Sequence, residues 1–255
     1  MRTNTLKRKI QDGRRTCGVL VEINDADLVE TLGHLGFDFV FLDGQHCGLN
    51  PEIARGLIRA ADLTGMTSIV RVPKNDPAVI LEYLEVGAGG IIVPNITTRA
   101  ETQAAVSAIR YPPAGTRGGF GRSRAAGYGL TQTQVEYFTK INDEMLFIPL
   151  VEDAAALDHA AAICGTPGVD AVVIGPGDLA LSMGIPGGWK DPRVQAGVEK
   201  IRSAAAAAKK PTMLVALDAA DGRALYEQGF QMLIVSAIGL ITGAGRTFLK
   251  EIGRT

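Results

Sequence analysis

Short runs of apolar residues alternate along the chain with longer stretches in which apolar residues recur at helical spacing. Continuous short apolar runs are typical of parallel strands buried on both faces, and the helical spacing is typical of amphipathic helices. The predicted strands are Thr16–Glu22, Phe37–Leu42, Thr67–Val72, Gly90–Val93, Met145–Val151, Val169–Ile174, Thr212–Leu217 and Met232–Ser236. The predicted helices are Ala26–Leu35, Pro51–Leu63, Pro77–Val86, Arg99–Ile109, Ala154–Ile163, Pro192–Lys209, Ala219–Gln228 and Ala237–Ile252.

This strand-then-helix rhythm has the size and pattern of a (β/α)8 barrel, the TIM barrel, which typically takes about 250 residues. A doubly wound open sheet is the second choice. No linker-like change of composition divides the chain, so we expect residues 1–255 to form one domain. The one long insertion, Tyr111–Leu130, follows the fourth unit near the end of the fourth strand. It suits either a substrate lid or a subunit contact.

Two acidic residues stand where predicted strands end. Glu152 follows the run Met145–Val151, and Asp178 follows the run Val169–Ile174 within a Gly-Pro-Gly-Asp turn. If these strands are parallel neighbours, both carboxylates emerge at the carboxyl edge of the sheet, where α/β folds place their ligands. Two carboxylates suit a hard divalent cation such as Mg2+ or Mn2+. The alternative is that each acid caps the helix that follows it, and spacing alone favours that reading.

Other predicted strands also end in polar residues, which barrel closure would bring to the same face. They are Asp43, Gly44, Gln45 and His46 after the second strand, Arg71 in the third, Pro94 and Asn95 after the fourth, and Gly175 to Asp178 after the sixth. A polar ring assembled from distant parts of a chain indicates catalysis better than any single member does.

Three members of this ring are candidates for specific roles. His46 suits a general acid or base, because imidazole titrates near neutral pH and Asp43 is a plausible partner to orient it. The alternative is a loop histidine beside a capping aspartate. Arg71 suits bidentate binding of a carboxylate or phosphate, and a salt bridge at the barrel rim competes with that reading. The backbone N–H groups around Gly177 suit a substrate carboxylate, although many βα loops contain glycine.

Composition narrows the class of protein. The net charge is -1, and Lys and Arg gather only in a short amino-terminal cluster, so we expect a small-molecule substrate and no nucleic acid. The three cysteines lack the spacing of metal ligands, which predicts reduced thiols in the cytoplasm. No stretch has the apolar length of a signal peptide or a membrane span, so we expect no membrane association.

A series of short motifs runs in order along nearly the whole chain. They are D-G-Q-H from Asp43, R-V-P from Arg71, E-V-G-A from Glu85, V-P-N from Val93, R-Y-P-P-A-G-T-R-G from Arg110, V-E-D-A-A-A-L from Val151 and V-D-A-V-V-I-G-P-G-D-L-A-L-S-M-G from Val169. In these motifs the chain resembles the metal-dependent class II pyruvate aldolases of the HpcH/HpaI type, the hydroxy-oxo-heptanedioate aldolase family. The combination of the last two motifs is specific to that family.

The resemblance implies a barrel of the phosphoenolpyruvate/pyruvate superfamily that cleaves or forms 4-hydroxy-2-oxo acids, with pyruvate and an aldehyde as partners. It implies a divalent ion, Mg2+ or Mn2+ with Co2+ or Zn2+ as alternatives, held by Glu152 and Asp178. Arg71 would contact the keto side of pyruvate. The N–H groups of the turn from Gly175 to Asp178 would bind the carboxylate of pyruvate.

The resemblance also implies the proton-transfer groups and the assembly. His46, oriented by Asp43, would move a proton at the aldehyde oxygen through metal-bound water. The family forms hexamers, or trimers of dimers, in which an acid from a neighbouring subunit helps. Glu85 matches the position of that acid, although the family more often has aspartate there.

Three departures from the family pattern bear on detail. Gln45 stands where the family usually has glutamate, which removes one negative charge near the metal, and Leu150 stands where many members have glutamine. The loop after Arg117 is shorter than in the pyruvate aldolases. We therefore expect the chemistry, but not the identity of the aldehyde, to carry over.

Two other functions stay open at this point. One is a superfamily lyase that acts on a larger acid or a CoA thioester, which would need a wider basic entry than Arg122 and Arg124 provide. The other is a non-catalytic barrel that binds a ligand. The joint presence of His46, Arg71 and the two acids speaks against it, because a binding protein has no need of a base.

Overall fold

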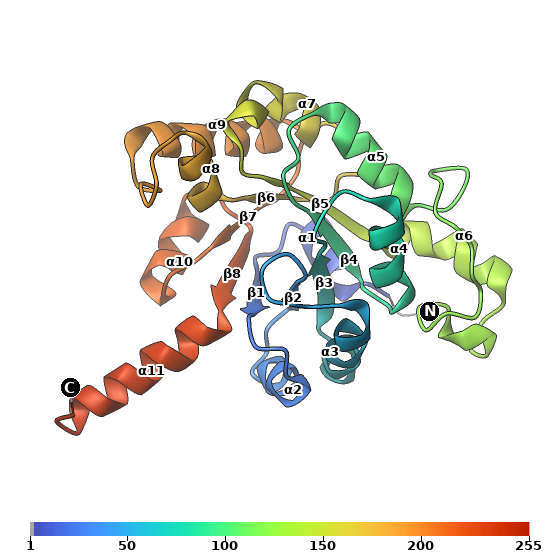
Figure 1. Ribbon diagram of the computed structural model, residues 1–255, viewed down its shortest axis with the longest axis horizontal. Coiled ribbons are helices and arrows are strands. Elements are labelled where there is room, and N and C mark those ends of the chain that lie inside the picture. The colour runs from blue at the N-terminus through green and yellow to red at the C-terminus, as the bar shows by residue number, and fades with distance from the viewer. Residues whose placement is uncertain (1–2, 255) are drawn as a thin grey trace.

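The computed structural model describes residues 3–254 and shows a closed barrel of parallel strands in sequential order, β1 to β8 (Figure 1). The strands are β1 Thr16–Val21, β2 Phe39–Asp43, β3 Thr67–Arg71, β4 Gly90–Val93, β5 Leu146–Val151, β6 Val172–Ile174, β7 Thr212–Val215 and β8 Met232–Ser236. The helices are α1 Thr5–Gln11, α2 Ala26–His34, α3 Pro51–Thr64, α4 Pro77–Glu85, α5 Arg99–Ile109, α6 Gln134–Glu144, α7 Ala160–Cys164, α8 Pro176–Ser182, α9 Pro192–Ala207, α10 Ala219–Glu227 and α11 Ala237–Glu251, with 3-10 turns η1 Gly127–Gly129 and η2 Ala154–His159. The predicted (β/α)8 barrel is confirmed, and the open sheet is wrong.

Local sequence sets where the helices begin and end. Helix α3 shows the pattern: the Asn50 side chain accepts a hydrogen bond from the N–H of Ile53, Pro51 occupies the first turn, and Gly65 ends the helix in the left-handed region at φ 80°. Proline tolerates the first turn because its missing N–H would be unpaired there anyway, and glycine carries no Cβ to strain a left-handed end.

The observed sixth strand is shorter than the sequence predicts, and the predicted helix Ala154–Ile163 divides into η2 and α7. The strand begins at Val172 rather than Val169 because Asp170 bonds to β5 with its side chain. Its carboxylate accepts a hydrogen bond from the N–H of Phe147 at 2.8 Å, which takes the place of a ladder carbonyl.

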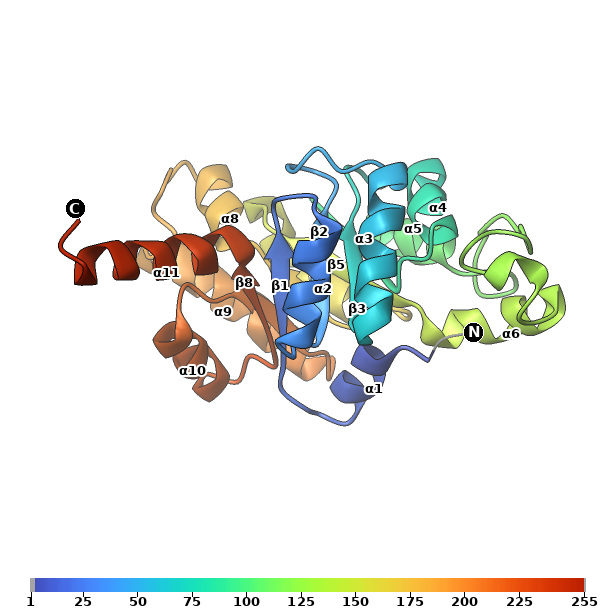
Figure 2. The same ribbon diagram turned by 90° about the horizontal axis from the view of Figure 1, so that it is seen from below.

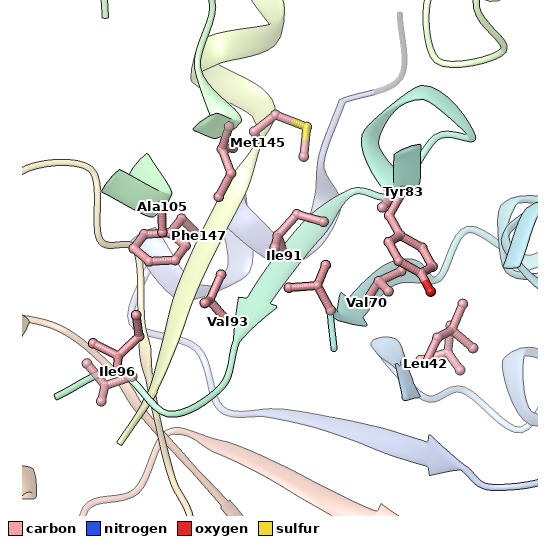
Figure 3. Close-up of a cluster of buried hydrophobic side chains, with 14 of the residues drawn as sticks. Leu42, Val70, Tyr83, Ile91, Val93, Ile96, Ala105, Met145 and Phe147 are labelled. Carbon is pink, nitrogen blue, oxygen red and sulfur yellow. The ribbon is translucent and has the colours of Figure 1, made fainter. Parts of the chain in front are cut away.

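Apolar side chains form two nested layers. One fills the barrel and includes Phe41, Ile69 and Ile148. The other lies between the strands and the surrounding helices, and Figure 3 shows part of it, with Leu42 and Val70 among its members. Because successive residues of a strand point to opposite faces, each strand contributes to both layers.

Helix α1 lies across the amino-terminal end of the barrel (Figure 2). Leu6 is fully buried and, with Ile10, belongs to the inner layer. The Lys7 ammonium donates to the carbonyl of Met145 at 2.8 Å and lies 3.1 Å from the Asp170 carboxylate. The barrel is therefore closed at this end, and ligands reach its interior from the carboxyl ends of the strands. We call this open end the mouth of the barrel.

The long insertion lies at the amino-terminal end of the barrel, and the expectation that it stands near the end of the fourth strand is wrong. It follows α5, which has already run back from the carboxyl ends of the strands. The η1 turn within the insertion and helix α6 after it are elements that the sequence did not predict. Tyr111 packs against Phe138 of α6 with ring centroids 4.4 Å apart. From this position the insertion cannot act as a lid over its own barrel mouth.

Helix α11 leaves the barrel after β8 and points away from it (Figures 1 and 2). Of its residues only Ala237 is buried. Large apolar side chains along it are exposed, namely Ile238, Leu240, Ile241, Phe248 and Leu249, followed by Ile252. Within residues 3–254, none of the helices has the length and apolar character that crossing a membrane requires.

Candidate active site

The inward faces of the strands continue as polar residues at the carboxyl end of the barrel. In β5, the apolar residues Leu146, Ile148 and Leu150 face inward, and Glu152 continues the same face one step past the strand. In β2, Phe41 is followed in the same way by Asp43. A side-chain period of two therefore turns the apolar barrel interior into a polar mouth.

Glu152 and Asp178 come together at this mouth. Glu152 is only 4% exposed, whereas Asp178 is exposed in the first turn of α8. The pKa of Glu152 is raised to about 7, first because burial penalises its charged form and further because of the charge of Asp178 and a hydrogen bond with it. The N–H of Asn95, which donates to Glu152 at 3.1 Å, and the charge of Arg71 partly oppose this rise.

The main chain is shaped around the Glu152 carboxylate on two sides. Asn95 has a φ of 54°, which is uncommon for a residue with a side chain, and this conformation accompanies the N–H bond to Glu152. Gly175 lies on the other side. A Cβ at that position would come within 2.7 Å of the Glu152 Cβ and 2.9 Å of its Oε2. Glycine is therefore needed there to leave room for the acid.

Asp43 and Arg71 form a two-pronged ion pair on the neighbouring strands β2 and β3. The Nε of Arg71 donates to Oδ1 of Asp43 at 2.9 Å, and Nη2 donates to Oδ2 at 2.6 Å. Burial by itself would raise the pKa of Asp43, but the hydrogen bonds and charge of Arg71 outweigh it, so the pKa is lowered. The pair fixes the guanidinium plane beside Glu152 and keeps Asp43 charged.

The structure gives Asp43 a different role from the expected one. Its Oδ1 accepts the main-chain N–H groups of Gln45 at 2.9 Å and His46 at 3.3 Å. Among the described residues, Asp43 forms hydrogen bonds with this turn, with Arg71 and with Cys47, and not with the imidazole of His46. Asp43 therefore shapes the turn that carries His46, whose exposed side chain stands at the mouth.

The Gly175 to Asp178 turn begins helix α8. Gly175 occupies the capping position and provides no side-chain hydrogen bond to the first N–H groups. A Cβ at Gly177 would meet nothing within 4 Å, so the space in front of this turn is open. The turn can therefore offer N–H groups to an anion next to Asp178.

Glu85 does not lie in this ring. It ends α4, at the amino-terminal end of the barrel, where its Oε1 accepts from Nη2 of Arg117 at 3.0 Å. The Arg117 side chain is fully buried and also donates to the hydroxyl of Tyr137. Within one chain, therefore, Glu85 is separated from His46 by the length of the barrel, and only another copy could bring the two residues together.

Glu22 is a residue of the mouth that the sequence reading missed. It follows β1 and continues the inward face of Leu20, level with Asp43, since Val21 pairs with Leu42. Its carboxylate accepts the hydroxyl of Ser236 and the N–H of Ile238 at 3.2 Å. The alternation of side chains between the two faces of the first strand could have revealed Glu22, because it places residue 22 on the same face as residue 20.

The residues at the mouth fit a divalent cation. Two carboxylates interact there, and the pKa of the buried one stays raised although the charge of Arg71 opposes the rise, so a further positive charge would favour ionisation of both. The Oε1 of Gln45 is a further buried acceptor without a partner in the described part of the chain. No group of three or more His, Cys, Asp or Glu side chains gathers at a metal-binding distance within residues 3–254. The protein would thus supply two acidic ligands and leave the other positions to small molecules.

Comparison with known proteins shows the family of the chain. The profile of the HpcH/HpaI aldolase/citrate lyase family matches residues 16–239. The chain belongs to this family. It is 35% identical to a hydroxypyruvate/pyruvate aldolase of Sagittula stellata over 195 residues, which are 76% of each chain. It is 33% identical to the 5-keto-4-deoxy-D-glucarate aldolase of Escherichia coli over 228 residues, covering 89% of this chain and 86% of that enzyme.

The fold comparison agrees as well. The structure of a family member from Burkholderia cenocepacia superposes with a TM-score of 0.93 and 30% identity, covering 98% of this chain and 99% of that chain. The family predicted from the motifs is thus confirmed, and so is the aldolase class of carbon–carbon lyase.

Proposed function

We propose that this protein is a divalent-metal-dependent pyruvate aldolase whose metal is held by Glu152 and Asp178. The observation that carries the proposal is the meeting of these two carboxylates at the open end of the barrel, with the buried one raised in pKa by its surroundings. Mg2+ or Mn2+ suits two oxygen ligands and an otherwise open coordination shell. When bound, the ion supplies positive charge that stabilises the negative oxygen developing on a 2-oxo acid.

The other residues of the mouth bind and orient the 2-oxo acid. Arg71 uses Nε and Nη2 for Asp43, which leaves the remaining N–H groups of its fixed guanidinium free to contact the keto side. The N–H groups of Gly177 and Asp178 bind the carboxylate in the open space before α8. With the acid held at both ends, the bond that breaks during cleavage lies toward the centre of the mouth.

His46 moves the proton at the aldehyde oxygen. In cleavage, it accepts the proton of the 4-hydroxyl group as the carbon–carbon bond breaks, and in aldol addition it returns that proton to the new hydroxyl. Its side chain is exposed, on a turn whose main chain is fixed by Asp43. This placement gives the imidazole room to meet the aldehyde portion of the substrate.

The working form is a homo-oligomer, which we propose to be a hexamer. The exposed apolar side chains of α11 support this, since an apolar surface of this kind marks a contact with another protein. Glu85 gives a second reason, because it can assist His46 only from a neighbouring copy. Light scattering of the purified protein measures the assembly. A monomer at micromolar concentration would contradict the proposed hexamer and the role of Glu85.

Pyruvate release from short 4-hydroxy-2-oxo acids tests the proposed activity. We expect release that is abolished by EDTA and restored by Mg2+ or Mn2+. Glu152→Gln and Asp178→Asn should abolish it, whereas Asp158→Asn, which removes an exposed acid of η2, should not. Turnover that EDTA leaves unchanged, or release only from a CoA thioester, would refute the proposal.

A further inference from the structure

Glu22 projects a carboxylate into the barrel mouth on the side away from the metal ligands. In a closed barrel of sequential strands, β1 lies across the barrel from β5, which leads to Glu152. Glu22 follows β1 on the inward face and is half-buried. A 2-oxo acid bound at Glu152 and Asp178 therefore leaves the space between it and Glu22 for the aldehyde.

The position of the Glu22 carboxylate is fixed by two neutral donors. Ser236, on the inward face at the end of β8, donates its hydroxyl, and Ile238 in the first turn of α11 donates its N–H at 3.2 Å. The same Ser236 oxygen accepts the N–H of Gly239 at 2.8 Å, which joins this contact to the start of the helix. Donors of this kind, at a helix amino terminus, stabilise a negative charge without cancelling it.

The other charges of the mouth are balanced within their own pairs. The charge of Asp43 is balanced by Arg71, 2.6 Å away. The charges of Glu152 and Asp178 would be balanced by the divalent ion of the proposed function. None of the salt bridges between residues 3–254 includes Glu22. Glu22 is thus a source of uncompensated negative charge on the wall that faces the aldehyde space.

The charge of Glu22 also acts on the turn that carries His46. The pKa of Cys47, the residue after His46, is raised to about 11, mainly by burial and by Asp43, and the charge of Glu22 contributes to the rise. Exposed apolar residues follow two of the strands on this side of the barrel, namely Ile23 after β1 and Leu217 after β7. The wall of the aldehyde space on this side therefore carries an acidic acceptor, whereas the Arg71 guanidinium at the mouth is paired with Asp43.

We propose that Glu22 determines the aldehyde specificity of the enzyme, by excluding aldehydes that carry a carboxylate and by accepting a hydrogen bond from the hydroxyl of a neutral hydroxyaldehyde. This inference rests on the proposed aldolase function and adds to it the chemical class of the second substrate. Exclusion of a like charge in a partly desolvated site is an effective means of discrimination, because the repelled ligand has no compensating partner.

Aldol addition to pyruvate with two pairs of aldehydes tests the proposal. Butanal and succinic semialdehyde have the same carbon number and differ by one carboxylate, and acetaldehyde and glycolaldehyde differ by one hydroxyl. For the wild-type enzyme with Mg2+, we expect kcat/KM to be at least about tenfold higher for butanal than for succinic semialdehyde, and higher for glycolaldehyde than for acetaldehyde.

Removal of the charge should change this selectivity. Glu22→Gln keeps an acceptor for Ser236 and should raise the kcat/KM ratio of succinic semialdehyde to butanal by about tenfold or more. Glu22→Asp retains the charge and should keep the wild-type preference. If Glu22→Gln does not fold, Glu22→Ser removes the same charge. Asp27→Asn, which removes an exposed acid of α2 from the same βα unit, is the matched control and should leave the ratio unchanged.

The failure of this inference can be distinguished from failure of the proposed function. Metal-dependent exchange of the pyruvate methyl protons with deuterium, followed by NMR, reports the metal centre of the wild-type enzyme without any aldehyde. If exchange occurs but succinic semialdehyde reacts as well as butanal, or Glu22→Gln leaves the ratio as in the wild type, the role of Glu22 is refuted. If exchange itself is absent, the proposed function fails as well.

Discussion

Replacing Glu152 with glutamine should make the metal-free protein more stable at alkaline pH while abolishing its response to metal. The pKa of Glu152 is about 7 in the folded chain, compared with an ordinary value of 4.5. The folded state therefore binds an extra proton between these two values, and stability from this group is lost as the pH rises through that window. Glutamine carries no charge to bury and should show no such loss.

The size of the effect follows from the two pKa values. Each pKa unit corresponds to about 1.4 kcal/mol, so ionising Glu152 in the folded, metal-free protein costs up to about 3 kcal/mol by pH 8. For a chain of this length, about 1 kcal/mol changes the melting temperature by roughly 2–4 °C. Glu152→Gln should thus melt roughly 6–12 °C above the wild type at pH 8 in EDTA, and close to it at pH 5.

Calorimetric melting at pH 5 and pH 8, with EDTA or with Mg2+, is the measurement. Mg2+ at pH 8 should raise the melting temperature of the wild type and leave that of Glu152→Gln unchanged, because ligand binding stabilises only the state that holds it. Asp158→Asn serves as a control for the loss of a surface carboxylate. An equal difference between wild type and Glu152→Gln at both pH values in EDTA would refute the reasoning.

Three further substitutions test separate parts of the site. His46→Ala should lower kcat for aldol cleavage by about 10²–10⁴-fold, with a small change in the pyruvate KM, and an equal loss in both constants would mean that the residue is only structural. Arg71→Lys loses the two-pronged contact with Asp43, whose Oδ atoms lie 2.9 and 2.6 Å from the guanidinium, and should raise the pyruvate KM at least about tenfold in steady-state assays. Gly175→Ala places a Cβ within 2.7 Å of the Glu152 Cβ and should weaken Mg2+ binding in calorimetric titration, while unchanged affinity would show that the acid can move without cost.

The sequence was sufficient to predict the barrel and most of its mouth. Strand ends carry the signal, because a buried parallel strand must be apolar until it reaches the ligand face, and Asp43, Arg71 and Glu152 each appear where that apolar run stops. Glu22 was missed because it was counted as the last residue of the first strand. Applying the two-residue alternation one step further would have placed it in the mouth.

The partners of the side chains could not be predicted in the same way. Asp43 pairs with Arg71 because β2 and β3 are neighbours in a register that puts the two residues side by side, a relation between distant segments. The position of Glu85 and of the long insertion could have been foreseen, since a helix that follows a barrel strand must return to the amino-terminal end. The direction in which α11 leaves the barrel could not have been foreseen, because its apolar pattern would be the same whichever surface covers the helix.

Helix α1 depends on contacts with segments that are synthesised much later than it is. Asn4, which caps the helix, donates its main-chain N–H to the Glu144 carboxylate at 2.6 Å and its side-chain amide to the carbonyl of Gly89 at 2.8 Å. On a ribosome, the helix therefore has no surface to dock on until the fifth strand has emerged. Docking of α1 on the amino-terminal end of the barrel is consequently a late event in folding. In the first half of the chain alone, the α1 segment should be unstructured.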